Sequence, residues 1–152
     1  MDEIESEFCY FKELIGQLNE NDEEKVNYAN RELNGLYMVN RVKCLRFAAR
    51  AIHENPENGS LIILSLSFIK RAATPTRTFS EIDIRNIWCD EENSEMKMEI
   101  RNSLTDAIMN EDSRVRLMAA AVFAYVIRIE KDQWEGVFQL ILEIANEERG
   151  ES

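Results

Sequence analysis

The sequence predicts an all-α fold in which antiparallel helix pairs of the HEAT type stack into an α-solenoid, with about seven helices. Hydrophobic residues make up 45% of the 152 residues, whereas five glycines and two prolines are too few turn formers for a many-stranded sheet. Apolar residues recur in steps of three and four, the period of one helical face. Successive helix pairs recur roughly every 40 residues, which is typical of HEAT repeats.

The first pair is predicted over residues 2–37. A helix over residues 2–18 is indicated by apolar residues spaced along one face, namely Ile4, Phe8, Phe11, Ile15 and Leu18. Asp22 is the predicted N-cap of the second helix. The second helix carries its own apolar stripe, which consists of Val26, Ala29, Leu33 and Leu36.

The second pair is predicted over residues 40–72. Its first helix, residues 40–53, stops before Pro56 because the residue that precedes a proline avoids the helical region. Its second helix begins after residues 58–60 and is apolar nearly throughout (LIILSLSFI). We expect this run to be a buried helix, since the sequence offers no second strand with which it could pair.

Residues 73–93 break the pattern and are predicted to be an insertion, with a loop at 74–78 and one short helix that buries Trp88. Ser94 is the predicted cap of the next pair, over residues 94–130. The second helix of that pair contains LMAAAVFAYVI, from Leu117 to Ile127, which has no charge on any face. We expect it to be covered on several sides, as a middle layer of the stack.

The turn before this helix contains Asp112, which we expect to cap the helix and to pair with Arg116 four residues later. Trp134 opens a final predicted helix over residues 132–147, the first helix of a fourth repeat.

The net charge of −11 means that the surface repels phosphate backbones, so a nucleic-acid partner is not expected. An acidic surface favours basic partners, or serves solubility alone. Cys9, Cys44 and Cys89 lack metal-ligand spacing and indicate reduced thiols in the cytosol or nucleus. The apolar runs are shorter than the roughly 18 residues of a membrane span, so no membrane association is expected.

Motifs for catalysis, cofactors and metals are missing from the sequence, and we expect no enzyme activity and no cofactor. The single histidine, His53, ends a predicted helix, where its cationic form would interact favourably with the helix dipole. A polar pocket around Cys89 or His53 would be needed to revive an enzyme hypothesis.

Several segments resemble the karyopherin-beta family of nuclear transport receptors, that is, importin beta and its relatives. Residues 104–120 follow the order of a HEAT repeat, with an Asp in the turn before a Val-Arg pair and small residues. Residues 124–130 (AYVIRIE) followed by Gln133 and Trp134 are similar to the family's Ala-x-Ile-Ala-x-Ile-Glu and Gln-Trp-Pro-Glu-Leu. Ala29, Leu33, Leu36, Lys70 and Trp88 also fall at matching places.

The resemblance implies a fragment or shortened relative of the amino-terminal region, because family members are several times longer. In the family this region binds the GTP form of the small GTPase Ran through second helices of the repeats. Only Lys70 matches a family position closely, and the other candidates are chosen by helical face. The candidate contact residues are Lys25, Tyr28, Arg31, Glu32, Lys70, Arg71 and Arg114.

The resemblance further implies residence in the cytoplasm and nucleus, with passage through the nuclear pore. Basic cargo or adaptor segments and nucleoporins would be partners of a longer chain. The sequence departs from the family at Arg71, where Asn is usual, and after Trp134, where no Pro follows. The alternative is a general HEAT scaffold that binds a basic or helical partner in another complex.

Overall fold

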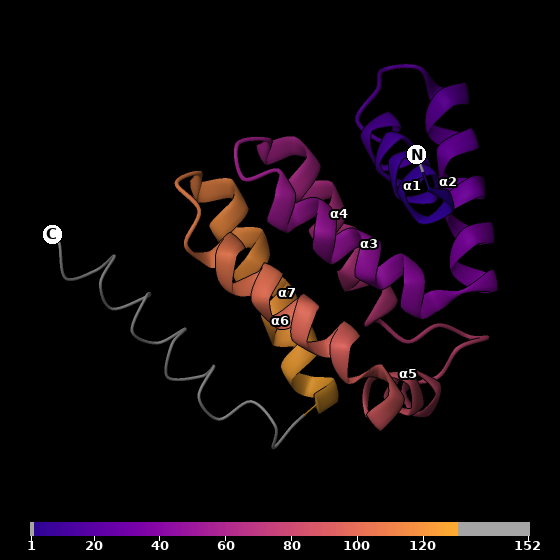
Figure 1. Ribbon diagram of the computed structural model, residues 1–152, viewed down its shortest axis with the longest axis vertical. Helices are drawn as coiled ribbons and strands as arrows, with labels where there is room; N and C mark the ends of the chain where they lie inside the picture. The colour runs from indigo at the N-terminus through magenta and orange to yellow at the C-terminus, as the bar shows by residue number, and fades with distance from the viewer. Residues whose placement is uncertain (1, 131–152) are drawn as a thin grey trace, which may run out of the picture.

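The computed structural model describes residues 2–130, which form helices joined by short connections (Figure 1). The helices are α1 (Glu3–Gln17), α2 (Glu23–Val39), α3 (Arg41–Glu54), α4 (Gly59–Ala72), α5 (Glu81–Trp88), the 3-10 turn η1 (Glu91–Asn93), α6 (Ser94–Ile108) and α7 (Ser113–Glu130). The described residues contain no strand, which confirms the predicted all-α class. The predicted helix over residues 132–147 lies outside the described residues.

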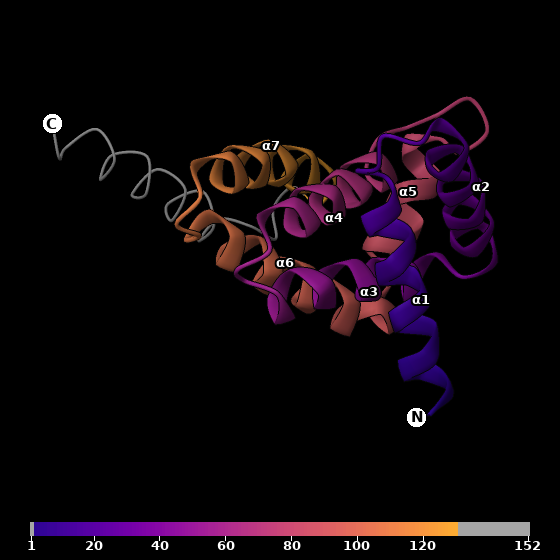
Figure 2. The same ribbon diagram turned by 90° about the horizontal axis from the view of Figure 1, so that it is seen from above.

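Two helix pairs stack in register. The helices α3 and α4 form one pair and α6 and α7 form the next, with α3 packed on α6 and α4 packed on α7. Figure 2 shows the resulting two layers, and we call α3 with α6 the A layer and α4 with α7 the B layer. This stacking of like helices on like is the arrangement of an α-solenoid.

The first pair meets this stack differently. The helix α1 contacts both α3 and α4, whereas α2 packs mainly on α1 and α3. Figure 2 shows α1 running across the end of the two layers rather than along them. An aromatic cluster fills this junction: the ring of Phe11 lies 5.7 Å from that of Phe47 and 5.3 Å from that of Phe68. These rings pack α1 against α3 and α4 at the place where α1 crosses the layers.

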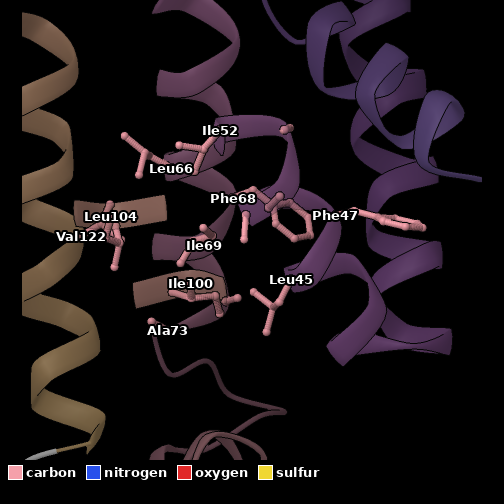
Figure 3. Packing of buried hydrophobic residues seen from close by; sticks show 14 of the residues in the cluster. Leu45, Phe47, Ile52, Leu66, Phe68, Ile69, Ala73, Ile100, Leu104 and Val122 are labelled. Atoms are coloured by element: carbon pink, nitrogen blue, oxygen red, sulfur yellow. The ribbon is translucent and has the colours of Figure 1, made fainter. Parts of the chain in front are cut away.

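The core lies between the two layers and contains both aliphatic and aromatic side chains (Figure 3). Leu66, Leu104 and Val122 are completely buried, although they come from α4, α6 and α7 respectively. Burial of an aliphatic side chain of this size contributes about 1.5–3 kcal/mol. The apolar run LIILSLSFI lies in α4, as predicted for a buried helix. The helix α4 has neighbours in both layers, which accounts for the burial of this run.

Side-chain caps begin most of the described helices. Asp22 accepts a hydrogen bond from the backbone amide of Glu24, as its predicted N-cap role requires. The predicted capping role of Ser94 was wrong, because Ser94 is the first residue of α6 and Asn93 precedes it without a side-chain cap. The preceding turn η1 is capped instead, by Asp90, which accepts from the amide of Glu92 at 2.9 Å. That turn leads the chain directly into α6.

The helix α7, which contains the charge-free stretch Leu117 to Ile127, is covered by α4, α5 and α6 and is therefore packed from several sides, as expected. Trp88 of α5, also predicted to be buried, is only 1% exposed. One stripe of α7 is nevertheless open to solvent, since Leu117 is 73% exposed and Ala120 and Ala124 are exposed too. This open stripe adds little apolar surface at its alanine positions, so a helical stretch without charges does not require burial all round.

Candidate partner-binding surface

The structure separates the seven predicted contact residues into three groups. One group lies on α2, one at the carboxyl end of α4, and Arg114 lies at the start of α7. The rise of an α-helix is 1.5 Å per residue, so the 11 residues between Gly59 and Lys70 span roughly 16 Å. Arg114 lies beside Gly59 at the start of α4. It is therefore separated by about the length of α4 from Lys70, which lies near the end of that helix.

The group on α2 faces α1. The hydroxyl of Tyr10 donates a hydrogen bond to Glu32 Oε1 at 2.7 Å and lies 3.3 Å from the hydroxyl of Tyr28. These hydrogen bonds, to Tyr28 and then to Glu32, raise the pKa of Tyr10 above its ordinary value. Lys25 shares this helical face by its spacing of three and seven residues from Tyr28 and Glu32. Arg31 is exposed on the same helix.

The group on α4 connects neighbouring helices. The Nζ atom of Lys70 lies 5.3 Å from the ring centroid of Tyr125 on α7, within the range of a cation–π interaction. The Nη2 atom of Arg71 lies 3.5 Å from Asn34 Oδ1 on α2, a long hydrogen bond. Tyr125 was not among the predicted contact residues. Its position beside Lys70 depends on how α4 and α7 stack, and no local motif encodes that register.

Arg114 is held by the turn that begins α7. Its Nη2 donates to Asp112 Oδ2 at 2.8 Å, and its backbone amide donates to Asp112 Oδ1 at 2.9 Å. The Arg114 side chain is the largest cause that lowers the pKa of Asp112. The predicted pairing of Asp112 with Arg116 was therefore wrong. Arg116 instead donates to the carbonyl oxygens of Asn110 and Glu111, at 3.0 and 2.8 Å.

The exposed and half-exposed residues on one side of α4 and α7 form a surface that we call the B face. On each helix these residues recur every three or four positions, so they share a side, and the contact between Lys70 and Tyr125 joins the two stripes. The B face consists of Ile63, Ser67, Lys70 and Arg71 of α4, and of Arg114, Leu117, Ala121, Ala124, Tyr125 and Arg128 of α7.

Three cations of α3, on the A layer, have a different environment, because carboxylates from neighbouring helices pair with them. On α3, Lys43 pairs with Glu7 of α1, and Arg46 lies 2.7 Å from Glu99 of α6. Arg50 lies 2.7 Å from Glu5 of α1 as well. These ion pairs connect the three helix pairs to one another, so their role is internal.

A groove of roughly 740 Å³ runs along α3 between α1 and α6, and His53 lies at its edge. His53 Nδ1 lies 2.9 Å from Asp106 Oδ2, but the imidazole is mostly exposed. The nearby Ser103 hydroxyl donates to the carbonyl of Ile100 at 2.8 Å, so it makes no nucleophile–base pair with His53. Within residues 2–130, no group of three or more His, Cys, Asp or Glu side chains could hold a metal ion.

The fold and this surface define a helical-repeat domain with an exposed second-helix layer. None of its described helices has the length and apolar character needed to cross a membrane. Comparisons with family models, curated proteins and solved structures gave no significant match.

Proposed function

We propose that this protein is a partner-binding α-solenoid whose B layer is the binding face. The observation that carries the proposal is the placement of α4 and α7 side by side, with cationic, aromatic and aliphatic side chains on their open side. Solenoids use such extended surfaces for partner recognition. Catalysis has no part in the proposal.

We further propose that the partner is the GTP form of Ran and that the protein acts in nucleocytoplasmic transport. The sequence resemblance supports this step, chiefly residues 124–130, which end α7. Gln133 and Trp134, which continue the resemblance, lie outside the described residues. Cargo, adaptors and nucleoporins would then be partners of a longer chain, in the cytoplasm, the nucleus and the pore.

Affinity for Ran loaded with GTP and for Ran loaded with GDP tests this proposal. We expect the GTP form to bind at least tenfold more tightly, a difference of about 1.4 kcal/mol. Equal affinity for the two forms, or binding of neither by a folded sample, would refute the nuclear transport function. Circular dichroism of the same sample establishes that the protein is folded.

A second candidate is a HEAT scaffold in a complex unrelated to transport. The observation that favours it is the separation of the seven predicted residues, because the Tyr28 and Glu32 side chains are engaged with α1 rather than placed beside Lys70. Co-purification of a stoichiometric partner in the absence of Ran would support this candidate. Competition between that partner and Ran-GTP would instead favour a role in transport.

A further inference from the structure

The helices of the B layer carry an excess of positive charge. The two helices of the B layer contain five cations and one acidic residue, although the whole chain has a net charge of −11. The cations are Lys70, Arg71, Arg114, Arg116 and Arg128. The acidic residue, Glu130, is only 4% exposed and therefore adds little to the surface. The described B layer is therefore basic, although the protein as a whole is acidic.

Two of these cations have no internal ionic role. Within the part of the chain that the structure describes, the neighbours of Lys70 and Arg71 are an aromatic ring and an amide, and neither cation has a carboxylate partner. On α3, by contrast, Lys43, Arg46 and Arg50 pair with carboxylates. The fourth cation of α3, Arg41, lies over the rings of Tyr37 and Phe79. The helix dipole accounts for cations in the last turn of α4, but it does not account for a B face without exposed acids.

The remaining charged groups of the B face are arranged at its two ends. Arg114 is paired with Asp112 at one end. Near the other end, Arg128 makes a long contact of 3.7 Å with Glu81 of α5, and its side chain is 68% exposed in the part of the chain that the structure describes. Because α4 and α7 stack side by side and Lys70 touches Tyr125, Lys70, Arg71 and Arg128 gather toward the carboxyl ends of the two helices.

Apolar groups lie between the two charged ends. Leu117 is 73% exposed, and Ala121 and Ala124 follow it along the same stripe toward Tyr125. Leu117 and Tyr125 are eight residues apart, which is roughly 12 Å along a helix. One exposed leucine is ordinary on a protein surface, but a strip of apolar groups that ends at an aromatic ring and a group of cations has the composition of a binding surface.

We propose that the B face binds an acidic protein segment that also carries apolar side chains. Carboxylates of the segment pair with Arg71 and Lys70, and its apolar side chains cover the strip from Leu117 to Tyr125. This inference rests on the proposed function in that the B layer is the binding face, and it adds the chemistry of the partner. Nucleic acid is disfavoured, because the acidic remainder of the protein would repel a phosphate backbone.

Selection from a displayed random peptide library, in which acidic and basic residues are equally frequent, tests the chemistry without a known partner. We expect the selected peptides to be rich in Asp or Glu together with Leu or aromatic residues. Enrichment of basic peptides, or no enrichment on the folded protein, overturns the proposal. A labelled single-stranded RNA is the second probe, and RNA binding that depends on Arg71 would likewise overturn it.

Charge reversal then locates the site of a selected peptide. Arg71→Glu and Lys70→Glu should each weaken peptide binding at least tenfold, and added salt should weaken the wild-type complex. The matched control is Arg77→Glu, which makes the same change of net charge in the exposed segment after α4. Equal affinities of the Arg71→Glu and Arg77→Glu proteins would overturn the assignment to the B face.

The peptide experiment and the Ran experiment can refute the two proposals independently of each other. If acidic peptides bind at Arg71 but Ran-GTP does not bind, the chemistry of the B face stands and the transport function fails. If Ran-GTP binds while Arg71→Glu has no effect and basic peptides are selected, the transport function stands and this inference fails.

Discussion

Glu130 provides a test of the packing between α6 and α7, because its side chain is 1% exposed and lies at their interface. The Nη2 atom of Arg101 lies 3.6 Å from Glu130 Oε2. Burial raises the pKa of Glu130 from 4.5 to about 7, against the opposing effects of Arg101 and Lys97. A shift of this size corresponds to on the order of 3 kcal/mol, at about 1.4 kcal/mol per pKa unit.

The direction in which the free energy of unfolding changes with pH follows from proton binding. Between pH 4.5 and 7 the folded protein keeps a proton on Glu130 that the unfolded chain releases, so the free energy of unfolding falls as pH rises through this window. Above pH 7 the destabilisation is complete. Glu130→Gln removes the ionisation while keeping the shape of the side chain, and it should therefore stabilise the protein at pH 8 by roughly 1–3 kcal/mol.

Urea unfolding monitored by circular dichroism measures this effect, at pH 5.5 and at pH 8. The quantity to compare is the difference between Glu130→Gln and wild type, since the other carboxylates cancel in it. Glu92→Gln, at an exposed position in η1, is the control and should show no such difference. The reasoning is refuted if Glu130→Gln gains nothing at pH 8, or if it gains equally at both pH values.

Three further predictions follow from core packing, helix contacts and thiol burial. Leu66→Ala should lower the free energy of unfolding, measured in urea, by about 2–5 kcal/mol, because Leu66 is completely buried. Ser67→Ala on the same helix should lower it far less, since Ser67 is half-exposed. Similar losses of unfolding free energy in the two variants would contradict the burial of Leu66. Gly35→Ala should raise the free energy of unfolding by about 0.5–1 kcal/mol, because the added Cβ meets nothing within 4 Å. Gly59→Ala should raise it less, since the added Cβ would lie 2.9 Å from Asp112 Oδ2. Equal increases in the two variants would refute that contact. Burial raises the pKa of Cys44 to about 11. Iodoacetamide at pH 8 should therefore label the exposed Cys9 and Cys89 well before Cys44, as followed by mass spectrometry. Rapid labelling of all three thiols would show that Cys44 is accessible.

The helices could be predicted from sequence because their signals are local. The apolar stripe through Phe8, Phe11 and Ile15 lies within one helix, and Asp22 caps the helix that directly follows it. Trp88 was predicted to be buried for the same reason, since Ile84 precedes it by one turn on the same face.

The arrangement of the helices depended on contacts between distant residues, which the sequence does not display. The packing of α1 where it crosses the layers brings the ring of Phe11 against those of Phe47 and Phe68. Tyr125 joined the candidate site only through the stacking of α7 on α4.

Asp112 illustrates a second limit, which is competition between nearby partners. Arg114 and Arg116 both follow Asp112 closely, and sequence spacing favoured Arg116 because it lies one turn away. The structure pairs Asp112 with Arg114, while Arg116 satisfies two carbonyl oxygens of the preceding turn. Such a choice depends on the geometry of the turn, which residue spacing alone does not specify.

Hydroxyl-radical footprinting with and without Ran-GTP tests the central claim most directly, because it reports which side chains a partner covers. We predict that Ran-GTP shields Leu117 and Tyr125 on the B face. Met98, which lies on α6 of the A layer and is 61% exposed, should keep its reactivity. Shielding of Met98 with Leu117 and Tyr125 unchanged, or no shielding at all, would contradict a partner-binding B layer that takes Ran-GTP.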